Sequence, residues 1–244
     1  MAAIAIGSIA VMFNSGVVKK YPTLIHADVI GSVYTVTIDD YMDNIDPASS
    51  TRHINLTAFW QDKEYVYVAL EMDNGVKHAE EIGKIVQDAV HGHNSQSDKN
   101  YTGWHLFMHS VLDPYNKHLH LLILDDMQDA DVVIRFTNLE DDHGLDAYGR
   151  TMQTLDSKKT NSLSFVHISV FEADKHYEEG LIQSIVEHEL GHALGLKHSS
   201  SLESIMYPRV VIRDDRPITA IGECEYRAIK TLYVDSKIGQ IPCD

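Results

Sequence analysis

The sequence predicts an α/β fold, and two kinds of pattern lead to this prediction. Several short segments are rich in alternating β-branched residues, which is typical of strands, and two longer segments carry apolar residues at helical spacing. Strands that flank one helix and precede another indicate a mixed sheet packed on helices. We therefore expect a twisted mixed sheet of about five strands packed on two helices.

The strands and helices are predicted in the following order. Strands are expected at residues 32–39, 64–72, 118–124, 130–136 and 164–171. Helices are expected at residues 79–91 and 179–194, and a shorter one at 101–113. A last helix should follow Thr219, which is a candidate N-cap.

Composition excludes two classes of function. The formal net charge of the 244 residues is -16, which would repel a phosphate backbone, so we expect no nucleic-acid partner. No stretch reaches the roughly 18 apolar residues that a spanning helix needs, so we expect no membrane-embedded body.

The first residues allow two interpretations. Met1 to Phe13 are nearly all apolar, as in the central region of a secretory leader, but Lys19 and Lys20 follow this run instead of preceding it. The segment could equally be a strand or helix of the core. The two cysteines, Cys224 and Cys243, also leave two possibilities open, a short-loop disulfide or a pair of buried thiols.

The segment HELGHALGLKH, residues 188–198, contains the candidate metal ligands and a candidate general base. His188 and His192 are four apart, so on a helix their imidazoles lie one turn apart on the same face. Glu189 then lies beside a metal held by these histidines without binding it. From that position its carboxylate can take a proton from a metal-bound water.

A third ligand requires the chain to turn. Gly195 tolerates positive φ, so we expect the helix to end there. The turn at Gly195 would direct the chain back and place His198 near the ion. Three imidazoles plus water make the open tetrahedral site of a catalytic zinc. The alternative, an amphipathic helix with surface histidines, explains neither the glycine nor the third histidine.

These residues, with Ser199 and with Met206 in SIMYP, resemble the metzincin metallopeptidases and within them the matrixin-like branch. The resemblance is strong over residues 181–208, looser over 130–171, and absent before residue 60. It implies a metzincin-like fold with a C-terminal subdomain that holds a tight turn at Met206 and the last helix. The zinc cleft would lie between residues 61–195 and 196–244, and residues 1–60 would form an N-terminal leader or pro-segment.

The resemblance also implies roles for single residues. His188, His192 and His198 would bind zinc, Glu189 would be the general base, and Met206 would form a floor under the metal without binding it. Tyr207 and Pro208 would line the pocket for the side chain after the scissile bond. An edge strand near residues 147–152 would form the upper rim of the cleft, to which an extended substrate adds as a further strand.

Two departures from the family pattern are expected. Neither cysteine precedes the domain, so we expect no cysteine latch on the zinc. The second, structural zinc of animal matrixins is not clearly matched, although His143 and His167 lie in the corresponding region.

Further histidines and acidic residues outside this motif could also bind metal ions. The histidines His91, His93, His105, His109, His118 and His120 could form a metal cluster, but we expect solvated or hydrogen-bonded side chains. Calcium is a further possible cofactor, because acidic residues gather at Asp125, Asp126, Asp129, Asp131 and at 140–142, although without fixed spacing.

The sequence therefore predicts a zinc-dependent endopeptidase that hydrolyses peptide bonds through a zinc-bound water, with Glu189 as general base. Its partners would be protein or peptide substrates, and a secreted or cell-surface location is favoured over the cytoplasm. The alternative is a zinc-stabilised protein-binding module without turnover. If residues 1–60 cover the cleft, the full chain would be a zymogen.

Overall fold

The fold is built on one large sheet, seen in a computed structural model that describes residues 23–30, 33–39, 51–92, 103–139, 148–175, 177–213 and 216–243. The strand order is β2-β1-β7-β8-β6-β4-β5. The strands are β1 (Thr23–Ile30), β2 (Val33–Asp39), β4 (Tyr65–Met72), β5 (His120–Leu124), β6 (Val132–Phe136), β7 (Gly149–Leu155) and β8 (Leu163–Val170).

Five adjacent strands form a mixed sheet of the predicted size; four of them match predicted strands, the fifth is β7, and the strand predicted at residues 32–39 is β2. Strands β5, β4, β6 and β8 are parallel, and β7 runs antiparallel to β8. The central strand β6 is buried at four of its five residues, whereas burial alternates along β8, where Val166, Ile168 and Val170 belong to the core. The α/β prediction with about five strands is confirmed.

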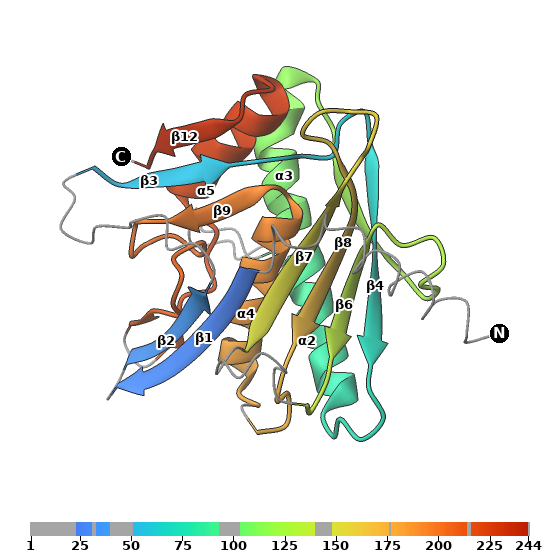
Figure 1. Cartoon of the computed structure of the whole chain (residues 1–244), viewed down its shortest axis with the longest axis vertical. Coiled ribbons are helices and arrows are strands. Elements are labelled where there is room, and N and C mark those ends of the chain that lie inside the picture. The colour runs from blue at the N-terminus through green and yellow to red at the C-terminus, as the bar shows by residue number, and fades with distance from the viewer. Residues whose placement is uncertain are drawn as a thin grey trace.

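Two long helices pack behind this sheet, α2 (Ala79–His91) and α4 (Glu179–Ala193) (Figure 1). The buried stripe of α2 contains the five apolar residues that the sequence pattern identified, from Ile82 to Val90. A third helix, α3 (Trp104–Leu112), lies beside them and continues into a short 3₁₀ turn at Asp113–Tyr115. Among the described helices, none is long and apolar enough to cross a membrane.

A second, smaller sheet joins distant parts of the chain in the order β12-β3-β9. Its strands are β3 (His53–Leu56), β9 (Leu196–Ser199) and β12 (Gly239–Pro242). Ile54 and Leu56 of β3 are buried in the same core as the large sheet. Residues 53–56 therefore pack with the part of the chain that follows them, and any processing that leaves this sheet intact must occur before His53.

The last helix begins later than the sequence suggested. Helix α5 (Glu223–Ile229) is preceded by Gly222 at its N-cap, and it continues as a π-helical turn, Lys230–Val234. The Glu225 side chain accepts the backbone N–H of Gly222 at 2.9 Å, so this carboxylate fixes the helix start. Thr219 lies outside the helix, and its prediction as N-cap was wrong.

The two cysteines, whose state the sequence left open, form a disulfide between Cys224 and Cys243. This bond connects α5 to the end of β12.

The strand expected at the rim of the cleft is β7, but it is not an edge of the large sheet. Strand β1 pairs antiparallel with it through Thr23 opposite Thr151 and Leu24 opposite Arg150. Strands β1 and β2 form a hairpin that extends the sheet beyond the five central strands (Figure 1). The apolar run Met1 to Phe13 lies outside the described residues.

Candidate metal centre

Two of the expected zinc ligands lie on α4 and face each other. The Nε2 atoms of His188 and His192 are 3.0 Å apart. His188 donates its Nδ1 proton to the carbonyl of Ile205 at 2.7 Å, and His192 donates its own to the carbonyl of Leu196 at 2.8 Å. These bonds fix both tautomers, so each Nε2 presents a lone pair toward the other.

The third histidine is brought in by the turn at Gly195. This residue has a φ of +95°, and a Cβ on it would lie 1.6 Å from the carbonyl oxygen of Ala58. Strand β9 follows and places His198 beside the first two histidines, with ring centroids 5.5 Å from His188 and 5.0 Å from His192. The Nε2 of His198 is buried and has no hydrogen-bond partner among the described residues.

This donor set fits a divalent transition metal. Burial is the main cause that lowers the pKa of His188 to about 4. Burial, followed by the neighbouring imidazoles, also lowers the pKa values of His192 and His198 well below their usual range. Three neutral imidazoles with converging ring nitrogens, one of them unpartnered, form the donor set that zinc prefers.

The end of α4 is held by side chains from four other elements or loops. Its carbonyls accept hydrogen bonds from Trp104 (to Glu187, 2.8 Å), Gln153 (to His192, 2.6 Å), Trp60 (to Ala193, 2.9 Å) and Tyr233 (to Leu194, 3.0 Å). The carbonyls of His192 and Ala193 belong to the last turn, where backbone carbonyls have no regular partner within the helix. These bonds therefore fix the backbone that carries His192.

Met206 lies fully buried in a turn that packs against α4. A Cβ on Gly191 would come within 2.2 Å of the Met206 sulfur, so the turn packs directly on the helix backbone. The turn is fixed from both sides, because Ser199 donates its N–H to the carbonyl of Met206 at 2.8 Å and Ser204 Oγ accepts that residue's N–H at 3.0 Å. The same Ser204 hydroxyl donates to the buried carboxylate of Glu225.

Glu189 lies next to His188 and is fully buried. Its Oε2 accepts a hydrogen bond from Thr151 of β7, whereas its Oε1 has no hydrogen-bond partner among the described residues. Burial is the main cause that raises the pKa of Glu189 to about 8, and the bond from Thr151 opposes this shift. A cation held by the neighbouring imidazoles would favour the carboxylate form.

A pocket opens beside His188. Its lining includes the apolar side chains of Ile185, Val210, Val211 and Ile218 together with Tyr207. The expectation from the sequence had placed Tyr207 and Pro208 at such a pocket. Tyr207 is among the lining residues and Pro208 is not.

Comparison with known proteins agrees with this arrangement. A family model described as matrixin matches residues 60–234. The chain belongs to the matrixin family. It is also similar to matrilysin of Felis catus, with 35% identity over 68 residues, and the match covers 26% of each chain. The chain thus matches about a quarter of the length of this curated relative.

The matrixin site contains contacts that motif spacing did not identify. Thr151 and Gly149 of β7 lie against the Glu189 side chain, and a Cβ on Gly149 would come within 2.8 Å of its Oε1. Glu225 supports the Met206 turn from α5. Gly191 alone carried a signal in the sequence, because a glycine inside a helix indicates a close approach of another group.

A second histidine cluster lies in a part of the matrixin fold far from this motif in sequence. His105, His109 and His120 each offer a ring nitrogen, and these nitrogens all lie within 4.8 Å of one another. Burial, with the adjacent imidazoles as a further cause, lowers the pKa of His105 to about 4. His118 lies outside this triplet, and His93 lies outside the described residues.

The sequence also raised a second zinc site and a calcium site, and the structure describes only some of the residues considered for them. His143, one of the two histidines considered for a second zinc, lies outside the described residues, as do residues 140–142. His167 on β8 lies 3.5 Å from the Ser169 hydroxyl. Asp131, one of the acidic residues considered for calcium, bonds to Lys63 and accepts the N–H of Tyr67 at 3.0 Å.

Proposed function

We propose that this matrixin is a zinc-dependent endopeptidase that hydrolyses peptide bonds in protein or peptide substrates. The proposal rests on the convergence of three imidazoles, two of them buried and that of His198 half-buried, beside a buried carboxylate, Glu189. Family membership supports the same class of activity.

We assign the zinc to His188, His192 and His198. When bound, zinc supplies a Lewis acid that lowers the pKa of water toward neutrality and stabilises negative charge on a scissile carbonyl. The two backbone carbonyls that accept the Nδ1 protons of His188 and His192 keep the correct nitrogens directed at the metal.

Glu189 would transfer the proton. Its Oε2 is anchored by Thr151, so Oε1 is the atom available to accept a proton from the attacking water. The same oxygen would return the proton to the nitrogen of the leaving amine. Thr151 is thus a positioning residue that holds the carboxylate in one orientation.

Substrate selection would depend on the pocket beside His188. Most of its lining is apolar, which favours an apolar side chain after the scissile bond, and Arg209 in the lining would disfavour a positively charged one. Tyr207 lies at this pocket and would contact the same side chain.

The N-terminal segment is proposed to act as a pro-segment. An extended substrate would add to the rim strand β7, and β1 pairs with that strand. The part of residues 1–60 that precedes His53, which includes β1, would therefore compete with substrate for the rim until it is removed. The disulfide between Cys224 and Cys243 favours a location outside the reducing cytoplasm.

Digestion of a peptide library tests the proposed activity. We expect cleavage before apolar residues, loss of cleavage on treatment with a zinc chelator, and recovery when zinc is restored. Bound zinc without turnover on any peptide or unfolded protein would instead favour a zinc-stabilised binding module.

A further inference from the structure

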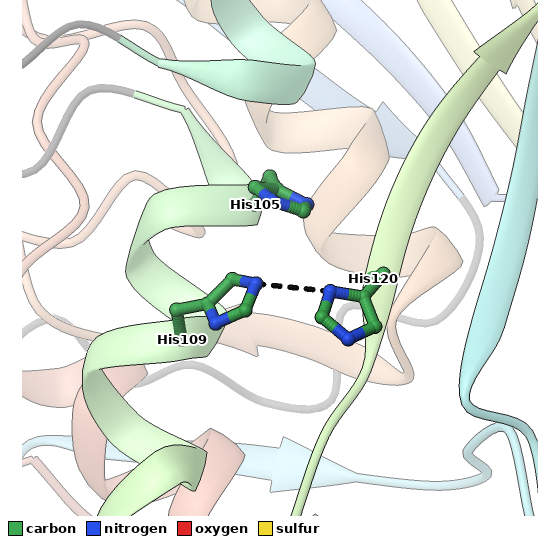
Figure 2. Close-up of side chains that lie close together, drawn as sticks. All are labelled: His105, His109 and His120. Carbon is green, nitrogen blue, oxygen red and sulfur yellow. Dashed lines mark hydrogen bonds between the residues drawn. The ribbon is translucent and has the colours of Figure 1, made fainter.

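Three histidines from α3 and β5 form a cluster that the proposed peptidase reaction does not use (Figure 2). His105 and His109 lie one turn apart on α3, and His120 is the first residue of β5. Figure 2 shows the rings of His109 and His120 facing each other, with Nε2 of the first 3.0 Å from Nδ1 of the second.

We propose that His105, His109 and His120 form a second metal site, which binds a divalent transition metal ion with Zn²⁺ as the preferred occupant. This site is separate from the residues assigned to catalysis, and it does not depend on the proposed peptidase activity.

The spacing of the rings suits a metal. For tetrahedral zinc with Zn–N bonds of about 2.0–2.1 Å, two ligand nitrogens lie about 3.3 Å apart. The 3.0 Å separation of the His109 and His120 nitrogens is close to this distance. The three ring centroids are 4.6, 4.7 and 5.7 Å apart, against 4.7, 5.0 and 5.5 Å in the triplet of His188, His192 and His198.

Asp113 provides the second observation that points to a metal. Its Oδ2 accepts the Nδ1 proton of His109 at 3.1 Å. This bond leaves the lone pair of His109 Nε2 free to face the centre of the cluster. A carboxylate that orients the ring of a ligand histidine is a regular feature of metal sites.

The other two histidines can change partners when a metal binds. Because the Nδ1 proton of His109 is directed to Asp113, its Nε2 accepts the Nδ1 proton of His120, and a metal would replace that proton. His105 Nδ1 accepts the N–H of Leu121 at 3.2 Å. A metal would compete with this N–H for the one lone-pair nitrogen of the neutral His105 ring.

The ligand set selects the chemical class of the ion. Three imidazoles without a carboxylate in direct contact favour zinc, copper or nickel over calcium or magnesium. Both cysteines of the chain are joined in the disulfide, so thiolates do not compete for the ion.

A metal at this cluster would link α3 to β5, the edge strand of the sheet. His105 follows Trp104, which donates its indole N–H to the carbonyl of Glu187 on α4. Trp104 also lies within 3.0 Å of the position that a Cβ on Gly191 would occupy. The site would therefore stabilise the layer that supports the helix carrying His188 and His192.

Zinc binding measured in a variant without the candidate catalytic ligands tests the proposal. The full chain carrying His188→Ala and His192→Ala is dialysed against micromolar free Zn²⁺, and bound zinc is measured by mass spectrometry. We expect that adding His109→Ala and His120→Ala removes one equivalent of zinc. The matched control His118→Ala, which removes another histidine bonded to Asp113, should leave the zinc content unchanged.

A milder variant keeps the test valid if the multiple substitutions prevent folding. Asp113→Asn in the otherwise unchanged chain should weaken zinc binding at this site about 10- to 100-fold, because it removes the group that orients His109. Equal zinc content with and without His109 and His120, or an unchanged zinc affinity in the Asp113 variant, would overturn the proposal. Peptide cleavage should survive in Asp113→Asn, so failure of this proposal would not imply failure of the peptidase assignment.

Discussion

At the scale of single residues, Gly195 has the strictest steric requirement of the site. Gly195→Ala should lower the free energy of unfolding by more than about 2 kcal/mol, because the new Cβ would clash with the Ala58 carbonyl in addition to the strain of positive φ. Denaturant unfolding monitored by circular dichroism measures the change. Gly75→Ala is the matched control, since Gly75 has a φ of +102° but open space around it. Equal losses in the two variants would contradict the role of the clash.

The three histidines that we propose as zinc ligands could be identified at this scale because they are close in sequence. Helical geometry alone places His188 and His192 on one face, and one glycine accounts for His198. Thr151 and Glu225 could not be predicted in the same way. Each lies more than twenty residues from the motif, and each contacts it only after the strand or helix that carries it has packed.

At the scale of elements, the disulfide connects α5 to β12 across 19 positions. Replacing both cysteines by alanine should reduce the free energy of unfolding by about 3 kcal/mol, because the unfolded chain regains the entropy of the open loop. Urea unfolding measures this loss. The wild-type chain in reductant should match the double variant, and a variant as stable as the oxidised chain would show that the link contributes nothing.

Removal of the N-terminal segment tests the pairing of β1 with β7. A chain that begins at residue 50 keeps β3 but lacks β1, so the rim strand becomes available to substrate. We expect a higher kcat/KM on peptides than for the full chain, mainly through a lower KM. Identical kinetics of the two chains would show that β1 does not compete with substrate.

Some of the helices and strands could be predicted from the sequence alone, and others could not. Helix α2 has a clear helical period and the parallel strands are runs of apolar and β-branched residues, so the sequence predicts their bounds within about two residues. Strands β3, β9 and β12 have four residues each and pair with segments far away along the chain. Too few residues alternate in them to give a pattern, and only the assembled fold forms that sheet.

At the scale of the whole molecule, bound zinc should raise the stability of the fold. A ligand present at a thousand times its Kd adds about 4 kcal/mol, which corresponds to a rise in Tm of about 10 °C for a chain of this length. Differential scanning calorimetry of the Glu189→Ala chain, with zinc and then with excess chelator, measures this shift without self-cleavage. A smaller shift is expected for the same chain carrying His192→Ala, and a Tm independent of zinc would contradict a folded metal centre.

The central claim, that zinc and Glu189 together hydrolyse peptide bonds, is tested most directly by one paired measurement on the Glu189→Ala variant. Its zinc content and its kcat/KM on a cleaved peptide are compared with those of the wild type and of Glu187→Gln, a change at another buried carboxyl of the same helix. We predict full zinc content in all three proteins and a loss of activity of about 100- to 10,000-fold in Glu189→Ala alone. Retained turnover in a zinc-loaded Glu189→Ala chain would contradict the account.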